Sequence, residues 1–337
     1  MKRSRVTIND VAREAGVSTA AVSQVLNSTG RISRPTSQKV LAAVSKLKYY
    51  PNHHAKGLAS GVNRTLGIIV SDIENPFFSV LIKNYEAQAR RYGFDVIVGE
   101  TSYDLALMRR CAERMMEQAV SGVAIMTSEM STVWLEEITQ RNIPITCFDL
   151  GFISDQASNI KVNYASGMLQ VVQHLYDLGH RRIAYVGGRR QLKNILSRLD
   201  GFLAAVRSLG LEPDPILTGN QRLDGGYAAG MEIAGMPSRP TAVVAVNDLT
   251  AVGLINAFNE ACVRVPGDIS VTGFDNTYLA AYFVPRLTTV DMHPDMLGRI
   301  AADALHEAIV APGARAGEYA IKIDLVVGKS SGPVTAG

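Results

Sequence analysis

The first 50 residues contain three short stretches in which apolar positions recur with the spacing of a helix face. In the first stretch the apolar face runs from Ile8 to Ala15, Thr7 and Asp10 form a capping-box start, and Gly16 provides a left-handed stop. A helix of about two turns is therefore predicted here.

Two further helices are predicted from the same spacing. Ser18 caps a short second helix, and Ser33 begins a third helix that runs to about Tyr49. The predicted inner faces are Ala21, Val22, Val25 and Leu26 in the second helix, and Val40, Leu41, Val44 and Leu47 in the third.

The outer side of the second helix carries Thr19, Ala20, Ser23 and Gln24. Two helices joined by a glycine-containing turn, the second with small polar residues outward, are typical of a helix-turn-helix that reads a major groove. There, Ser18 and Thr19 can bind phosphate or base edges, Ala20 can touch a thymine methyl, and Gln24 can pair with adenine. A helical hairpin used only for packing is the alternative interpretation.

From residue 66 onward, short β-branched runs alternate with amphipathic helices, which is typical of a parallel sheet covered by helices. The predicted strands are 66–70, 94–98, 123–126 and 145–148, with helices over 78–92 and 105–118. The pattern restarts with strands at 183–186, 242–246 and 269–272. The predicted fold class is therefore α/β, with an all-α head in front of two parallel sheets.

Polar and aromatic residues gather where these strands end, and ligands of open α/β sheets bind at the carboxyl ends of strands. The candidates are Asp72, Asn75, Phe77, Ser128 and Asp149 from the first half, and Arg198, Asn247 and Asp275 from the second. Carboxylates, amides and a guanidinium suit vicinal hydroxyls, and an aromatic ring suits the apolar face of a sugar. Arg198 is alternatively a structural ion pair, and Asp248 is alternatively a helix cap.

The charge is unevenly distributed along the 337 residues, whose formal net charge is only +3. Residues 1–60 contain ten lysines and arginines but two acidic residues, so the rest of the chain is mildly acidic. A basic head favours a polyanionic partner, with a solvated basic surface as the alternative. Three scattered cysteines form no CxxC pair, and neither a signal peptide nor a membrane span is evident, so a cytoplasmic protein is expected.

Motifs for catalysis and metal binding are missing from the sequence. Gly328-Lys329-Ser330 lacks the earlier glycine of a phosphate loop, and no GxSxG, HExxH or GxGxxG pattern occurs. We therefore expect no enzyme activity, no cofactor and no metal. The competing classes are a cytoplasmic sugar enzyme with a DNA-binding head and a transport-type sugar-binding protein.

Several segments together resemble the LacI/GalR family of bacterial transcription regulators. They are TINDVAREAGVSTAAVSQVLN (7–27), YYPNHHAKGLAS (49–60), LGIIVSDIENPFF (66–78), LGHRRIAYVGG (178–188), SRLDGF (197–202), RPTAVVAVND (239–248), VPGDISVTGFDN (265–276) and PRLTTV (285–290). The resemblance implies a two-lobed, periplasmic-binding-protein-like body of two Rossmann-like sheets. It also implies effector-binding roles for the positions of Asp149, Arg198, Asn247 and Asp275, and stacking by Phe77.

The resemblance further implies that residues 51–61 form a hinge helix when two chains sit on DNA, with Leu58 wedged into the minor groove and Lys56 near the backbone. A flexible linker is the alternative. The candidate DNA contacts are Thr7, Ser18, Thr19, Ala20, Ser23, Gln24, Asn27, Arg31, Asn52, Ala55, Lys56 and Leu58. Leu192, Asn194 and Gln221 depart from the purine-responsive relatives, which argues against a purine effector.

The predicted organisation is a DNA-binding domain (1–50), a hinge (51–64) and an effector-binding and dimerisation domain (65–330). Its first lobe comprises about 65–160 plus 291–320, and its second about 161–290 plus 321–330. The predicted function is repression of carbohydrate-utilisation genes by a homodimer on a pseudo-palindromic operator, controlled by a sugar or sugar derivative. The alternatives are a regulator with a corepressor, an activator and a non-regulatory sugar-binding protein.

Overall fold

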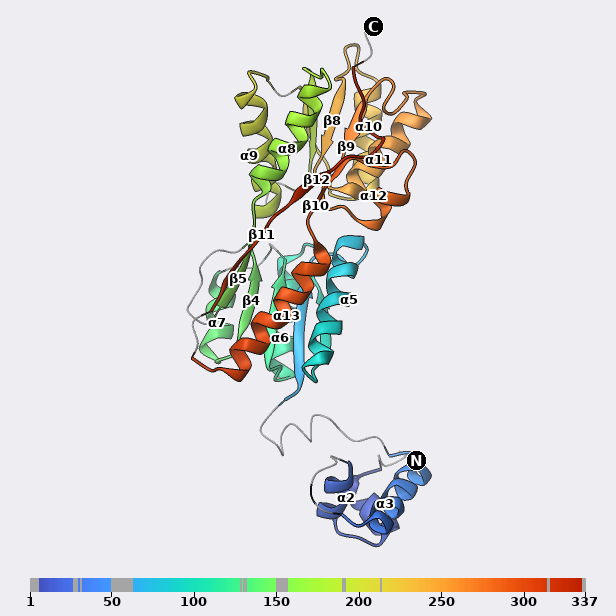
Figure 1. Ribbon diagram of the computed structural model, residues 1–337, viewed down its shortest axis with the longest axis vertical. Coiled ribbons are helices and arrows are strands. Elements are labelled where there is room, and N and C mark those ends of the chain that lie inside the picture. The colour runs from blue at the N-terminus through green and yellow to red at the C-terminus, as the bar shows by residue number, and fades with distance from the viewer. Residues whose placement is uncertain are drawn as a thin grey trace. The chain divides into compact units, whose positions relative to one another are not determined.

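The computed structural model describes residues 6–26, 30, 32–49, 63–127, 129, 132–149, 157–189, 192–212, 214–313 and 316–334. The chain divides into two compact units, a head (Met1–Asn63) and a body (Arg64–Gly337). Figure 1 shows the elements of each unit in chain order.

The head contains α1 (Ile8–Ala15), α2 (Thr19–Leu26) and α3 (Arg34–Leu47). The predicted helix starts are confirmed, because the Thr7 N–H donates to the Asp10 carboxylate at 2.9 Å and Ser18 Oγ accepts from the Ala21 N–H at 3.2 Å. Gly16 ends α1 with φ of 66°, the left-handed conformation that glycine adopts at little cost.

The prediction that Leu41 belongs to the head's core is wrong. Its side chain keeps 53% of its surface exposed, whereas Val40 and Ala43 are buried. The face of α3 in this core runs through Val40, Ala43 and Val44. Leu41 lies about 100° around the helix from Val40, which turns it towards solvent.

The first lobe of the body is a parallel six-stranded sheet with the strand order β11-β5-β4-β3-β1-β2. Its strands are β1 (Thr65–Val70), β2 (Asp95–Glu100), β3 (Gly122–Met126), β4 (Ile145–Phe148), β5 (Ala157–Val162) and β11 (Glu318–Ile321). Its helices are α5 (Pro76–Arg91), α6 (Leu105–Glu117), α7 (Thr132–Gln140) and α13 (Pro294–Val310). The last helix and edge strand therefore return from the C-terminal part of the chain.

The second lobe is a parallel sheet with the order β7-β6-β8-β9. Its strands are β6 (Ile183–Gly187), β7 (Ile216–Thr218), β8 (Ala242–Ala245) and β9 (Ser270–Thr272). Its helices are α8 (Tyr164–Asp177), α9 (Lys193–Ser208), α10 (Leu223–Ala234), α11 (Asp248–Glu260) and α12 (Tyr278–Tyr282). A short antiparallel ribbon of β10 (Thr289–Asp291) and β12 (Asp324–Val326) accompanies the two sheets.

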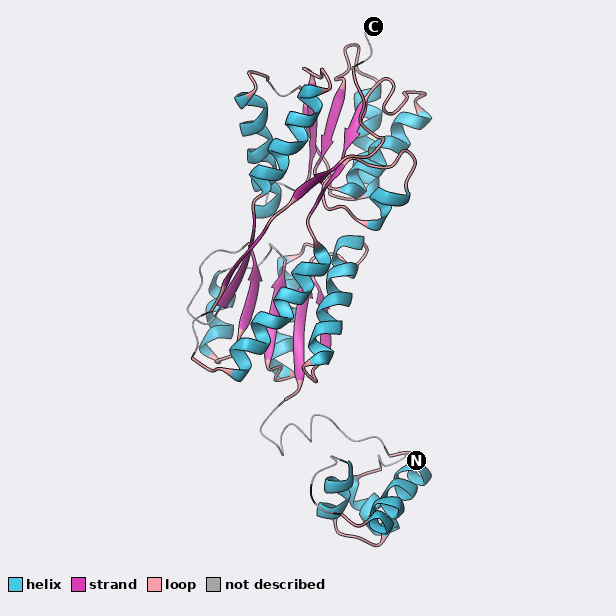
Figure 2. Ribbon diagram, in the orientation of Figure 1, coloured by secondary structure: helices cyan, strands magenta, loops and turns pink. Residues whose placement is uncertain are grey.

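Helices cover both faces of each sheet (Figure 2), which explains why β1, β3 and β8 are apolar at every position after Thr65 of β1. On β1, Ile68 packs in the cluster that contains Leu81 of α5 and Leu297 of α13. The next residue, Ile69, packs on the opposite face with Met108 of α6. The body thus has three layers in each lobe, and its strand ends are left for polar residues.

Among the helices of the described ranges, none combines the length and apolar character that a membrane span requires.

Candidate functional sites

Helix α2 presents small side chains to solvent along its N-terminal half. Thr19, Ala20 and Gln24 are exposed, and Ser23 is half-buried. Short side chains let a helix approach a groove floor closely, and the glutamine amide offers the donor and acceptor that match an adenine edge. The helix therefore has the surface that major-groove recognition requires.

The other predicted DNA contacts are only partly within the described residues. Thr7 is exposed at the start of α1, where its hydroxyl donates to Asp10 at 2.7 Å as part of the cap. Outside the described residues lie Asn27, Arg31, Asn52, Ala55, Lys56 and Leu58. Their roles stay predictions.

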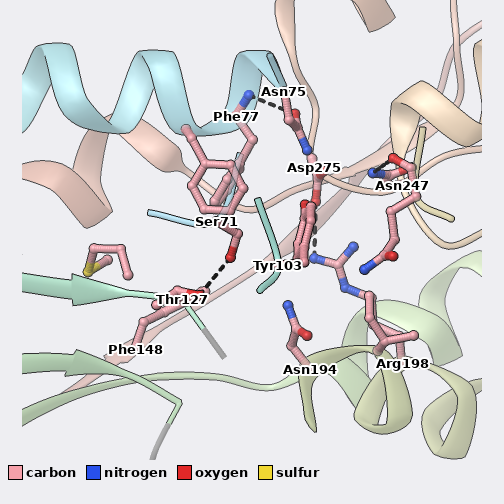
Figure 3. A pocket seen from close by; sticks show the side chains of 14 residues that line it. Ser71, Asn75, Phe77, Tyr103, Thr127, Phe148, Asn194, Arg198, Asn247 and Asp275 are labelled. Atoms are coloured by element: carbon pink, nitrogen blue, oxygen red, sulfur yellow. Dashed lines mark hydrogen bonds and ion pairs between the residues drawn. The ribbon is translucent and has the colours of Figure 1, made fainter. Parts of the chain in front are cut away.

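A pocket lies in the body where strand ends of both lobes meet (Figure 3). The pocket is narrow in this structure, with a cavity volume of about 30 Å³. Five of the predicted effector residues line it: Asn75, Phe77, Arg198, Asn247 and Asp275. Its lining combines apolar side chains with a few polar groups, which is typical of a small-molecule site.

The two lobes contribute different chemistry to the pocket. The first lobe supplies an apolar wall of Phe77, Phe78, Met126 and Phe148, together with Ser71, Asn75, Tyr103 and Thr127. The second lobe supplies a polar wall of Asn194, Arg198, Gln221, Asn247 and Asp275, together with Ile195. A ligand with one apolar face and several polar groups fits such a pair of walls.

Arg198 and Asp275 form a buried ion pair at the centre of the polar wall. The Arg198 guanidinium donates to Asp275 Oδ1 at 3.1 Å and to the Val246 carbonyl at 2.6 Å, and it lies 4.4 Å from the Phe274 ring centroid. Burial raises the pKa of Asp275, and the arginine opposes that rise. Arg198 therefore forms the structural ion pair that was its alternative interpretation, and both side chains also line the pocket.

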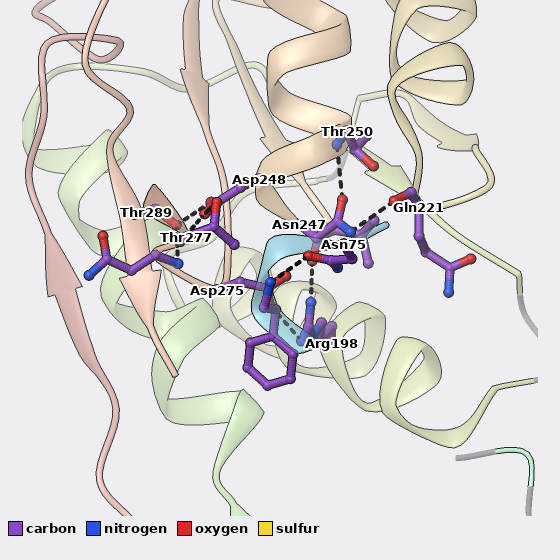
Figure 4. A network of polar contacts seen from close by, with 12 residues as sticks. Asn75, Arg198, Gln221, Asn247, Asp248, Thr250, Asp275, Thr277 and Thr289 are labelled. Atoms are coloured by element: carbon purple, nitrogen blue, oxygen red, sulfur yellow. Dashed lines mark hydrogen bonds and ion pairs between the residues drawn. The ribbon is translucent and has the colours of Figure 1, made fainter. Parts of the chain in front are cut away.

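Two asparagines connect the pocket to helix N-termini (Figure 4). Asn75 caps α5 by accepting from the Phe77 N–H at 3.0 Å. Asn247 caps α11 by accepting from the Thr250 N–H at 2.9 Å, and its amide donates to the Gln221 carbonyl at 2.9 Å. The positive ends of both helix dipoles therefore lie beside the pocket and favour electron-rich ligand oxygens.

Asp248 has neither a capping role nor a place among the pocket-lining residues, so the helix-cap interpretation of Asp248 is wrong. Its carboxylate accepts from the Thr277 N–H at 2.7 Å, the Thr277 hydroxyl at 3.0 Å and the Thr289 hydroxyl at 2.6 Å. These bonds tie the start of α11 to the segments after β9 and in β10 (Figure 4). Asn247, one residue earlier, provides the cap.

The structure places two other predicted effector residues away from this pocket lining. Asp72 pairs with Arg222 at 2.9 Å. Asp149, with φ of 55°, accepts from the Val162 N–H at 2.8 Å and lines a neighbouring depression, which shares Asn194 with the pocket. Burial raises the pKa of Asp149. Ser128 lies outside the described residues.

Several residues that line the pocket were not predicted from the sequence, above all Tyr103, Thr127 and Phe148. Thr127 follows β3 directly, and Tyr103 follows β2, so the rule that ligands bind at strand ends contained the signal for both. The predicted candidate after β3 is Ser128, the next residue, which lies outside the described residues and stays a prediction. In the described part of the chain, no group of three or more His, Cys, Asp or Glu residues is arranged to hold a metal ion.

A helix-turn-helix head joined to a two-lobed, ligand-binding body defines a ligand-responsive transcription regulator. The family model for bacterial regulatory proteins of the lacI family matches residues 7–52, and that for a periplasmic binding protein-like domain matches residues 172–331. The chain belongs to the lacI family of bacterial regulatory proteins.

The chain is similar to known repressors over nearly its whole length. The HTH-type transcriptional repressor PurR of Photobacterium profundum is 34% identical over 96% of this chain and 98% of its own length. The ribose operon repressor of Escherichia coli K12 is 34% identical over 91% of this chain and 94% of its own. The lac repressor dimer bound to operator and the anti-inducer ONPF has a TM-score of 0.83 at 27% identity, covering 97% of this chain and 99% of that one.

Proposed function

We propose that this protein represses carbohydrate-utilisation genes by binding a pseudo-palindromic operator as a homodimer, under the control of a small neutral sugar. The observation that carries the proposal is the amphipathic pocket between the lobes, in a chain whose head presents α2 to solvent. Each head reads one half-site, and the protein acts in the bacterial cytoplasm, at the nucleoid when bound.

The charges in the pocket support a neutral polyhydroxy effector. Arg198 and Asp275 neutralise each other, so burying an additional ligand charge there would leave it without a counter-ion. Their remaining lone pairs and N–H groups match vicinal hydroxyls, while Phe77 and Phe148 offer an apolar surface for a ring. Gln221 adds an amide to the polar wall, which can hydrogen-bond a ligand hydroxyl.

Exposed apolar side chains on the second lobe support dimerisation. Tyr282 and Val284 are 85% and 82% exposed, and Leu223, Tyr227 and Tyr278 are also exposed. They belong to α10, α12 and the turn after α12, and both helices pack on the same core cluster of this lobe. Such a group of apolar residues on a water-soluble surface is typical of an interface, here with a second copy of the chain.

Control of DNA binding follows from population shift. A sugar that binds both walls stabilises the lobe arrangement in which the walls are close together. The lobes of two subunits in that arrangement set the separation of the paired hinge segments, and hence the fraction of dimers that can hold both half-sites.

Selection from a random pool of double-stranded DNA tests the proposal. The full chain, at near-physiological salt and with and without a mixture of pentoses and hexoses, should enrich a symmetric site. Gln24→Ala should relax one base position in each half-site without changing the salt dependence, because the amide contacts a base edge rather than a phosphate. Failure to enrich any site under either condition would contradict the proposal.

Ligand-induced thermal stabilisation tests the effector class separately. Monosaccharides such as D-ribose should raise the melting temperature of the full chain, and hypoxanthine should leave it unchanged. Stabilisation by hypoxanthine alone would assign the pocket to purines instead.

A further inference from the structure

Two arginines of the second lobe reach across to the first lobe beside the pocket. Arg222, which precedes α10, places one guanidinium nitrogen 2.9 Å from Asp72 Oδ2 and another 3.6 Å from Glu74 Oε2. Arg189, which follows β6, lies with its guanidinium carbon 5.7 Å from the centroid of the Tyr103 ring. Asp72 and Tyr103 come after β1 and β2, so both contacts join strand ends of opposite lobes.

Asp72 depends on the other lobe for its counter-ion. Its side chain is only 3% exposed, whereas that of Arg222 is 40% exposed. The second carboxylate oxygen accepts from the Glu74 N–H at 3.0 Å, which is a contact within the first lobe. A carboxylate that loses its cation while buried is costly, so separation of the lobes must either expose Asp72 or leave it uncompensated.

The first lobe holds Tyr103 in place through an unusual loop. Ser102 and Tyr103 have φ of 47° and 59°, so two consecutive residues other than glycine adopt the left-handed conformation. Glu100 Oε1 accepts from both the N–H and the hydroxyl of Ser102, at 3.0 and 2.8 Å. A conformation of this kind persists only where neighbouring bonds enforce it. Here those bonds keep Tyr103 in the pocket lining and in contact with Arg189.

We propose that Arg222 is a positioning residue that latches the two lobes together through Asp72, with Arg189 on Tyr103 as a second, weaker contact. The latch holds the pocket walls close together before any effector binds. Its role in regulation rests on the proposed function. While the ion pair holds the lobes together, it slows the entry and release of a sugar and fixes the lobe arrangement on which DNA binding by the heads depends. The latch itself requires neither sugar nor DNA.

Distances between spin labels on the two lobes test the latch in the full chain. One label is attached to Cys262, which is exposed in the second lobe, and the other to Glu117→Cys at the end of α6, in a Cys111→Ser background. Labelled protein is mixed with an excess of unlabelled protein, so that most dimers contain only one labelled subunit. Without sugar or DNA, the labelled protein with Arg222 and Asp72 intact should give mainly one distance. Arg222→Gln should raise the ratio of the longer-distance to the shorter-distance population by about tenfold, and Asp72→Asn should do the same.

A double-mutant cycle separates the latch from a general loosening of the fold. If the two residues act through one contact, the double variant Asp72→Asn with Arg222→Gln is no more open than either single variant. Arg264→Gln serves as the control, because it breaks an exposed ion pair with Asp268 inside the second lobe. It should leave the distances unchanged.

The proposal is overturned if Arg222→Gln keeps the original distances, or if the two substitutions add independently. The spin-label distances are measured without DNA or sugar. A failure to select an operator, which would contradict the proposed function, would therefore not change the result of this test.

Discussion

Asp248 shows how a single buried carboxylate can impose a pH dependence on folding. Three donors from Thr277 and Thr289 hold it, while burial and the nearby Asp275 raise its pKa to about 7. A raised pKa means that the folded state binds the proton more tightly than the unfolded chain does. The resulting stabilisation is fully present below the ordinary pKa of an aspartate and is lost as the pH rises through the folded value.

We expect Asp248→Asn to remove this dependence. Relative to the variant, the free energy of unfolding of the unmodified protein should fall by about 1–2 kcal/mol between pH 5 and pH 8. Urea denaturation at both pH values measures the difference. Asp268→Asn is the control, because Arg264 hydrogen bonds hold the pKa of Asp268 at about 2, below this range. An equal slope in Asp248→Asn and the unmodified protein would show that Asp248 does not titrate in this range.

Asp275 offers the second prediction at the scale of a residue. Asp275→Asn keeps the shape of the side chain but removes the negative charge beside Arg198. We expect sugar affinity to fall at least about tenfold, while the DNA sequence selected by the head stays the same. Titration of the melting temperature with D-ribose measures the first quantity, with Asp224→Asn on the surface of α10 as the control. Unchanged affinity would remove Asp275 from the effector site.

At the scale of elements, the pocket depends on close packing between α10 and α11. A Cβ on Gly226 would lie 2.2 Å from the Thr250 carbonyl oxygen, and one on Gly253 would lie 2.1 Å from the Leu223 carbonyl oxygen. Both neighbours are backbone atoms and cannot turn aside as a flexible side chain can. The helix that Asn247 caps and the helix that Arg222 precedes are therefore held at a fixed separation.

Gly226→Ala should force these helices apart and lower the free energy of unfolding by about 1–3 kcal/mol. Gly235→Ala, at the end of the same helix, is the matched control, because its Cβ would meet only atoms at an ordinary 3.6 Å. Urea denaturation of the two variants measures the contrast. Equal stability would mean that the helices relax without cost.

Elements whose sequence signal is local could be predicted, and those that depend on distant partners could not. Strands β1, β3 and β8 are continuous apolar runs because helices cover both of their faces. Strand β7 was not predicted, because it has only three residues, all half-buried or exposed, and so gives no buried apolar run. Strand β11 was not predicted either, because only its pairing with β5, more than 150 residues earlier in the chain, identifies it as a strand.

The candidate site was predictable to the same extent. Asn247 and Asp275 follow predicted strands, were predicted as candidates and line the pocket. Gln221 also lines the pocket but follows β7, a strand that was not predicted, and was not among the candidates. The partner of Asp72 could not be predicted, because Arg222 is 150 residues away and meets it only once both lobes have folded. A sequence pattern gives strand ends, but it does not tell which of them face one another.

At the scale of the whole molecule, assembly should depend on the apolar residues of the second lobe. Tyr282→Asp places a charge on the most exposed of them and should convert the protein to a monomer at micromolar concentration. Analytical ultracentrifugation measures the change, and Lys322→Gln, at an exposed position, controls for the same change of net charge. A Tyr282→Asp protein that stays dimeric would place the interface elsewhere.

The division of the pocket into an apolar wall and a polar wall, each on its own lobe, also dictates the kinetics of recognition. A ligand must first meet one wall, and the second arrives only when the lobes come together. The observed binding rate should therefore level off at high ligand concentration, at the rate of the domain motion itself. Release of the ligand must likewise wait until the lobes open again. The residence time of the ligand is therefore set by the rate of lobe opening more than by the ligand's own contacts.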